Sequence, residues 1–203
     1  MKRRFAILLL IACLQPLLFG GERPRFTCGV GWGSVTHFYE NGYSLYITPD
    51  KYLAENFIND WKLNFNAAFE LRAGIACRRC ELYAYSGYRG YAPGTLQLPA
   101  GLRLQLFVGR QKRVEGCFLT ADSSVGIPLR KGEIHSFSAL CGGGYRLRLS
   151  PSFAIDYSLV LNYGRARPNK ITDPISNQVI DTEDIRNAFV NQFGIGIGMA
   201  LVF

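Results

Sequence analysis

The sequence predicts an all-β protein, a single eight-stranded antiparallel up-and-down transmembrane β-barrel. Three observations carry this prediction. Large apolar residues alternate with small or polar ones in eight segments, each long enough to cross a bilayer as a tilted strand, for which about 9–11 residues suffice. Every second connection between these segments is short. The charged residues of the segments gather on the face opposite the large apolar side chains.

Composition agrees with one domain of many short elements. The chain has 203 residues, of which 48% are hydrophobic and 13% aromatic, and it contains 22 glycines. Beyond residue 21, however, no run approaches the roughly 18 consecutive apolar residues of a membrane-spanning helix. The net charge is +8, but the arginines are scattered through the predicted strands, so we predict no nucleic-acid partner.

The N-terminus has the pattern of a secretory signal peptide. Three basic residues precede a short apolar stretch that ends in small and polar residues. We therefore predict a cleaved signal peptide at residues 1–20 and a barrel domain at residues 22–203. A second interpretation is a lipoprotein, because residues 10–13 resemble a lipoprotein box that would acylate Cys13.

Four of the eight segments alternate cleanly. In the segment 63–75, large or small apolar residues occupy every odd position, while Asn64, Asn66, Glu70 and Arg72 share the other face. The other three clean segments are 96–108, 153–163 and 189–203. Less regular segments are 25–40, 80–91, 114–128 and 134–149, and the second of these carries tyrosine on both faces.

The connections alternate in length. In chain order they are long (about 41–60), short (77–80), medium (near 93–94), short (110–113), medium (128–133), short (150–152) and long (about 168–188). Transmembrane barrels show this asymmetry, with short periplasmic turns and longer outer loops. The two long loops are the best candidates for contact with an external partner, because exposed loops on a rigid scaffold commonly carry recognition.

The charged residues decide which face points outward. An eight-stranded ring has an interior just wide enough to be filled by side chains, where charges of both signs can pair. One arginine turned outward at the bilayer midplane costs about 2–4 kcal/mol, so we place the charges inside. The predicted polar network of the lumen consists of Glu70, Arg72, Arg103, Asp122, Arg146, Arg148 and Asp156.

Closure of the barrel requires the last segment to pair with the first, since unpaired backbone groups in hydrocarbon are very costly. Both segments carry glycine on the face toward the lumen. The glycines expected to meet across this seam are Gly29, Gly31 and Gly33 with Gly194, Gly196 and Gly198. Two interpretations stay open: a thin wall that leaves volume for large lumen side chains, or relief of crowding in a strongly curved sheet.

Together these features resemble the small outer-membrane β-barrels of OmpA/OmpX type, the porin-family or outer membrane protein β-barrel domain sequences of Gram-negative bacteria. The resemblance covers nearly all of the mature chain and is architectural, without a diagnostic motif. It implies a location in the cell outer membrane, in contact with its lipids. It also implies that the barrel-assembly machinery reads the terminal segment, a role carried over to Phe193, Met199, Leu201 and Phe203.

The cysteines and histidines give little sign of chemistry. Cys77 and Cys80 flank two arginines in a predicted turn, where a hairpin-closing disulfide and two free thiols are the open interpretations. No second pair accompanies them, so we predict no metal and no cofactor. Cys117 and Cys141 fall on lipid-facing positions, where cysteine acts as a small hydrophobe.

Some barrels of the resembled type are lipid A-modifying enzymes with a histidine and a serine on the lipid-facing wall. His135 should face lipid near the outer leaflet, but Ser136 and Ser138 point inward. A hydrolytic triad needs its nucleophile within hydrogen-bond reach of the base, so we predict no catalytic residue. The other histidine, His37, is expected in the lumen network or at its upper rim.

The sequence therefore predicts a non-enzymatic structural or surface protein with a side-chain-filled lumen, whose outer loops contact an unknown extracellular ligand or partner. Two alternatives are kept. One is a lipid A- or phospholipid-modifying enzyme acting through His135. The other is a soluble periplasmic lipid carrier of lipocalin type, in which the apolar face would be inside.

Overall fold

The computed structural model describes residues 24–46, 53–77, 79–89, 97–108, 115–129, 135–166, 170–172, 179–181 and 185–203; within 39–64 and 167–188 it describes only the course of the strands. The predicted signal peptide and Cys13 lie outside these residues. No helix in the described part of the chain is long and apolar enough to cross a membrane.

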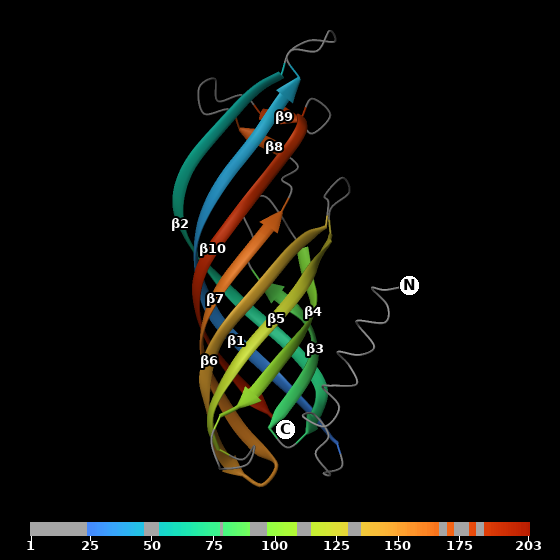
Figure 1. Cartoon of the computed structure of the whole chain (residues 1–203). Coiled ribbons are helices and arrows are strands. Elements are labelled where there is room, and N and C mark those ends of the chain that lie inside the picture. Colours follow the sequence, from blue (N-terminus) through green and yellow to red (C-terminus); the bar gives the residue numbers. More distant parts are fainter. Residues whose placement is uncertain are drawn as a thin grey trace, which may run out of the picture.

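Eight long strands close into a barrel (Figure 1). They are β1 (Arg25–Tyr46), β2 (Leu53–Cys77), β3 (Cys80–Arg89), β4 (Gln97–Phe107), β5 (Gly116–Pro128), β6 (Ser136–Ser150), β7 (Phe153–Ala166) and β10 (Ile185–Val202). Each pairs antiparallel with its neighbours along the chain, and β10 closes on β1. The predicted eight-stranded antiparallel barrel is confirmed.

Apolar and charged side chains lie on opposite faces of the barrel wall, as the alternation in the sequence predicts. Leu102, Leu159 and Ile197 are 58%, 60% and 65% exposed on the outside. Arg146 and Asp156 are 3% and 2% exposed inside the barrel. Leucine and phenylalanine therefore cover the outer wall, and the charged side chains are enclosed, which confirms the predicted sidedness.

Three strands continue beyond the rest of the barrel. β1 and β2 stay paired up to Tyr46 and Leu53, and β1 pairs with β10 up to Ile185. By contrast, β3 joins β2 only from Ala68, and β7 ends at Ala166. The three strands form a protruding sheet at the upper end of Figure 1, made of residues 42–46, 53–57 and 185–189.

This sheet corrects the expectation of two long loops. Most of 41–60 is strand rather than loop, because the neighbouring β1 and β2 continue to satisfy each other's backbone groups. The stretch 168–188 also contains structure: β8 (Lys170–Thr172) pairs with β9 (Val179–Asp181), and β10 has begun by residue 185. From the sequence alone, a strand cannot be distinguished from a loop where apolar residues no longer alternate with polar ones.

The opposite end of the barrel, called the turn end, carries the short connections at residue 79 and at 151–152. There the backbone N–H of Phe203 donates to the carbonyl of Cys28, at 2.8 Å, and the N–H of Cys28 donates back at 3.2 Å. The side chains of Phe193 and Phe203 are about half exposed on the outer wall, at 49% and 53%. The role of the terminal strand in assembly stays a prediction.

The seam between β1 and β10 differs from the expected glycine pairing. Only Gly33 and Gly198 lie directly opposite each other, because the pairing of the chain end with Cys28 sets a different register. The thin wall nevertheless makes room inside. A Cβ atom on Gly29 would lie 2.9 Å from Nε of Arg72, and one on Gly31 would lie 2.8 Å from Cγ of Glu70. Gly31 therefore supports the first interpretation, in which glycine leaves volume for the lumen side chains, whereas a Cβ on Gly29 or Gly33 would meet the backbone of β10 first, as the second interpretation requires.

Replacing Gly33 by alanine is expected to destabilise the barrel by about 1–3 kcal/mol, the usual cost of overpacking. Its Cβ would overlap the carbonyl oxygen of Ile197 and lie 3.0 Å from Cα of Gly198, and backbone in a paired sheet cannot yield easily. The urea midpoint in lipid vesicles measures the effect. Gly164→Ala is the matched control, since its Cβ meets nothing nearer than 3.5 Å; equal midpoints for the two variants would contradict the account.

Candidate functional site

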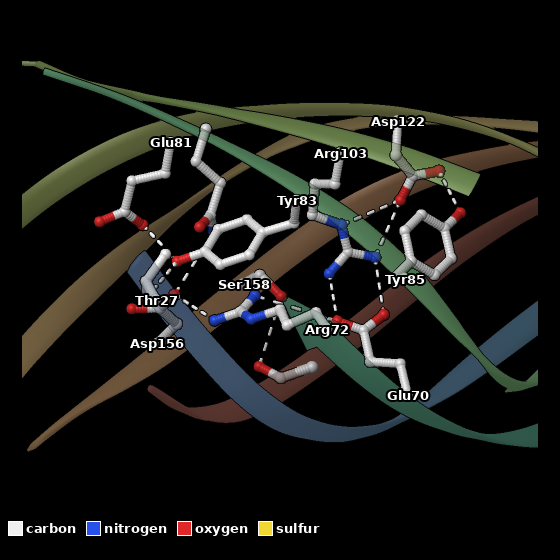
Figure 2. A network of polar contacts seen from close by, with 12 residues as sticks. Thr27, Glu70, Arg72, Glu81, Tyr83, Tyr85, Arg103, Asp122, Asp156 and Ser158 are labelled. Atoms are coloured by element: carbon white, nitrogen blue, oxygen red, sulfur yellow. Dashed lines mark hydrogen bonds and ion pairs between the residues drawn. The ribbon is translucent and has the colours of Figure 1, made fainter. Parts of the chain in front are cut away.

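The lumen holds two clusters of charged side chains, each built around one arginine. We name them the Arg146 cluster and the Arg103 cluster. The Arg146 cluster contains Arg72, Glu81, Tyr83, Arg146 and Asp156, and the Arg103 cluster contains Glu70, Tyr85, Arg89, Arg103 and Asp122. Figure 2 shows eight of these side chains converging from different strands, with Arg103 between Glu70 and Asp122; the eight are Glu70, Arg72, Glu81, Tyr83, Tyr85, Arg103, Asp122 and Asp156.

In the Arg146 cluster, one guanidinium bridges two carboxylates. Its Nη1 and Nη2 donate to the two oxygens of Glu81 at 2.7 and 2.8 Å. Its Nε and Nη2 donate to the two oxygens of Asp156 at 2.5 and 2.8 Å. Both forks are bidentate and charge-assisted, the strongest kind of protein hydrogen bond. Arg72 adds a bond of 2.7 Å to Asp156, and the hydroxyl of Tyr83 donates to Glu81 at 2.6 Å.

The Arg103 cluster repeats the arrangement. Both terminal nitrogens of Arg103 donate to the carboxylate of Glu70, and its Nε and Nη2 donate to Oδ2 of Asp122 at 3.1 and 2.8 Å. The hydroxyl of Tyr85 donates to the other oxygen of Asp122 at 3.1 Å. Arg89 lies 3.6 Å from the same carboxylate. The guanidinium of Arg103 also lies over the ring of Tyr85, 4.9 Å from its centre.

The two clusters are joined and electrically balanced. The link is Nη1 of Arg72 in the Arg146 cluster, which lies 3.9 Å from Glu70 in the Arg103 cluster. Within the Arg146 cluster, Nε2 of Gln105 also lies 3.4 Å from Asp156. Each cluster contributes two carboxylates and two guanidinium groups, so the charges cancel. Because a buried unpaired charge is very costly, this pairing is what permits so many charges inside an eight-stranded ring. The network ties together six consecutive strands, β2 to β7.

Six of the seven predicted network residues meet in these clusters, and the seventh does not. Arg148 has the right parity, but it lies close to the turn end, where its Nε donates to the carbonyl of Ser150 at 2.8 Å. Its assignment to the network is therefore wrong. Four members of the clusters lie on β3 and were not predicted from the sequence: Glu81, Tyr83, Tyr85 and Arg89. The available signal was that they occupy odd positions of β3, whereas the even positions Leu82, Ala84, Ser86 and Tyr88 are exposed.

His37 lies inside the lumen, 1% exposed, in a separate neutral group. The amide nitrogen of Asn66 lies 3.3 Å from its Nδ1, and that of Asn162 lies 3.1 Å from its Nε2. His135 lies outside, where its Nδ1 is 3.3 Å from the carbonyl oxygen of Gly126.

The serines near His135 point the other way. Ser136 donates to the side chain of Gln97, and Ser138 lies 2.6 Å from the hydroxyl of Ser124 inside the barrel. Among the described residues, no three His, Cys, Asp or Glu side chains are grouped so that they could hold a metal ion. Ser136 and Ser138 therefore do not form a hydrolytic triad with His135.

Cys77 and Cys80 face each other across the β2–β3 hairpin, and both are buried. Their thiols are free in this structure, which is one of the two states left open; the disulfide stays a prediction. Cys117 and Cys141 are exposed on the outer wall, as their parity predicted.

The side chains of the clusters are enclosed in the lumen, where Arg72, Arg146 and Asp156 are 4%, 3% and 2% exposed. A cavity of about 70 Å³ lies beside them, lined among others by Gly31, Glu70, Arg103, Gln105 and Thr120. Sites that bind small molecules usually measure about 300–1,000 Å³. This cavity is smaller than that range, and the clusters link the strands that carry them.

Fold and lumen define the class: a closed eight-stranded barrel with its charges inside and its apolar side chains outside. Among solved structures, the chain is similar to the crystal structure of Neisserial surface protein A, at 12% identity and a TM-score of 0.45, over 88% of this chain and 98% of that chain. It is also matched to two structures of the InvG secretin of the Salmonella type III secretion injectisome.

The first secretin structure shows 7% identity over 100% of this chain and 64% of that chain, with a TM-score of 0.19. The second shows 9% identity over 99% and 66%, with a TM-score of 0.17. No protein-family model and no curated protein matches the sequence. The fold assignment therefore rests on the strand pairing of this chain itself.

Proposed function

We propose that this protein is an integral outer-membrane β-barrel with a non-enzymatic, structural or surface role. The observation that carries the proposal is the inverted distribution of side chains, with Leu102 and Ile197 exposed and Arg146 and Asp156 enclosed. Strands closed into a barrel satisfy every backbone group in hydrocarbon, and an apolar outer band with a polar interior is the pattern of such barrels. A soluble lipid carrier would need the reverse arrangement, because its cargo lies in an apolar interior.

The protruding sheet supports contact with a partner outside the cell. Among the described residues, none pairs with the outer edge of β2 between Leu53 and Ala67, where only β1 is bonded on the inner side. An open sheet edge is a template for an extended peptide, which adds to it as a further strand. The partner we propose is therefore a protein or peptide segment that binds in extended form, and the short turns then face the periplasm.

The proposal is tested by membrane fractionation combined with gel migration of unheated and boiled samples. A closed barrel should fractionate with the outer membrane, resist detergent until it is boiled, and then shift in apparent size. Recovery of the mature chain in a detergent-free soluble fraction would overturn the proposal.

A second measurement separates this barrel from a general porin. Because the two clusters fill the lumen, planar bilayers that contain the protein should show no large and persistent conductance; water-filled channels need about 16 strands. Such a conductance, recorded from protein that shows the heat-dependent shift, would refute the closed lumen while leaving the barrel intact.

A further inference from the structure

The cavity beside the two clusters is bounded by the charged side chains and by the wall that β1 and β10 form. Glycines from both of these strands line it, among them Gly31 and Gly196. The rest of the lining is partly apolar and partly polar. The polar side chains include one from each of four consecutive strands, β2 to β5: Arg72, Arg89, Gln105 and Thr120.

Each of these four side chains carries a buried polar atom that has no hydrogen-bond partner within the described part of the protein. The atoms are Nε of Arg72, Nη1 of Arg89, Oε1 of Gln105 and Oγ1 of Thr120. The four residues are at most 6% exposed, so bulk water does not reach them. Folded proteins leave few buried polar atoms unbonded. Four of them on the lining of one small cavity therefore indicate that the cavity holds a polar ligand.

The chemistry of the four atoms restricts that ligand. The guanidinium nitrogens of Arg72 and Arg89 can only donate a hydrogen bond, and the hydroxyl of Thr120 can donate or accept. Oε1 of Gln105 can only accept, because Nε2 of the same amide faces Asp156 at 3.4 Å. An anion could not donate to Gln105 and would meet the carboxylates of the clusters. A cation would meet the guanidinium groups. Water both donates and accepts, so it suits all four.

The register and the volume agree with water. Gln105 and Thr120 lie directly opposite each other on β4 and β5. Their Cβ atoms are thus about 4.5–5.5 Å apart, yet Oε1 of Gln105 and Oγ1 of Thr120 are not bonded to each other. One water between them can bond to both. The cavity measures about 70 Å³, and a buried water needs about 10–15 Å³, so there is room for about five.

We infer that the lumen cavity is a binding site for a group of about five ordered water molecules. These waters accept hydrogen bonds from Arg72 and Arg89 and bridge Gln105 to Thr120. A water-mediated bond is nearly as favourable in enthalpy as a direct one, so the waters join the four strands where protein groups do not. The site lies wholly within the lumen and does not depend on the proposed membrane location.

The direct test is the transfer of magnetisation from water to alanine methyl groups, measured in the rotating frame on the labelled barrel in micelles. Ala200 lines the cavity and is 6% exposed, so its methyl group should show a cross-peak with long-lived water. The matched control is Ala76, which is equally buried at 7% but does not line the cavity, and should show none. A missing cross-peak at Ala200 would overturn the inference.

Thr120→Val tests the site through stability. If Oγ1 of Thr120 is bonded to water, its loss should raise the unfolding equilibrium constant about fivefold, the effect of one net hydrogen bond. Thr27→Val is the comparison, because the hydroxyl of Thr27 donates to the carbonyl of Phe203 at 3.2 Å, and a similar loss is expected there. Urea titration in lipid vesicles measures both. A Thr120→Val barrel as stable as the wild type, or more stable, would mean that the hydroxyl is unbonded and the cavity dry.

A third measurement identifies the occupant. In crystals grown with bromide as the halide, we expect electron density for water in the cavity and no anomalous signal of bromine there. A bromine peak beside Arg72 and Arg89 would overturn the assignment to water in favour of a small anion.

Discussion

Replacement of Arg146 by methionine is expected to lower the free energy of unfolding by about 3–5 kcal/mol, the usual cost of removing one partner from a buried ion pair. The guanidinium makes bidentate bonds to both Glu81 and Asp156, and the side chains of all three are at most 4% exposed. Methionine fills much of the volume but leaves Glu81 without a cationic partner among the described residues. Asp156 retains Arg72 and the amide of Gln105.

Urea titration of the protein in lipid vesicles, followed by circular dichroism, measures this effect. Arg148→Met is the control, because Arg148 lies on the same strand and face but, among the described residues, bonds only the carbonyl of Ser150. We expect the control to change stability by less than about 1 kcal/mol, as substitutions away from buried networks do. Equal losses in the two variants would show that the Arg146 cluster does not hold the barrel together.

Leu102→Arg is expected to destabilise the barrel in membranes by about 2–4 kcal/mol, the cost of an outward arginine near the bilayer midplane. Leu102 is 58% exposed and lies in the middle of β4. Its neighbour Arg103 faces inward and is fully paired, so the same side chain at two successive positions would meet opposite environments.

A leucine at a different depth in the membrane provides the control for the Leu102→Arg variant. Leu149 is 54% exposed and lies close to the turn end, one residue before the end of β6. Leu149→Arg should cost only about 0–1 kcal/mol, because the penalty falls near the membrane interface. Refolding equilibria in vesicles compare the two variants. A penalty that does not depend on depth would argue against hydrocarbon around the wall.

The fold could be predicted because it depends on a local property. Alternation with a period of two places a residue inside or outside whatever its partners are, so Arg103, Asp122 and Asp156 could be assigned to the lumen from the sequence. A strand such as β5, which alternates in burial almost along its whole length, needs no further information. The choice of outward face followed from the cost of exposing charge to lipid.

The contacts of each lumen side chain and the register between strands could not be predicted in the same way, since both depend on the stagger between strands. Glu81 bonds Arg146 from the far side of the ring, 65 residues away in sequence, and no local pattern specifies that meeting. The seam shows the same limit, because its register follows from the pairing of Phe203 with Cys28. Arg148 shows that inward parity alone does not bring a residue into the network.

The most direct test of the account is the quenching of Trp32 fluorescence in a Trp61→Phe variant, which leaves a single tryptophan. Trp32 is 41% exposed on the outer wall. If acyl chains surround this wall, lipids brominated on their acyl chains will quench the fluorescence strongly, and aqueous iodide will have little effect. Strong quenching by iodide with none by brominated lipid would mean that water, not membrane, covers the leucines and aromatic residues outside the barrel.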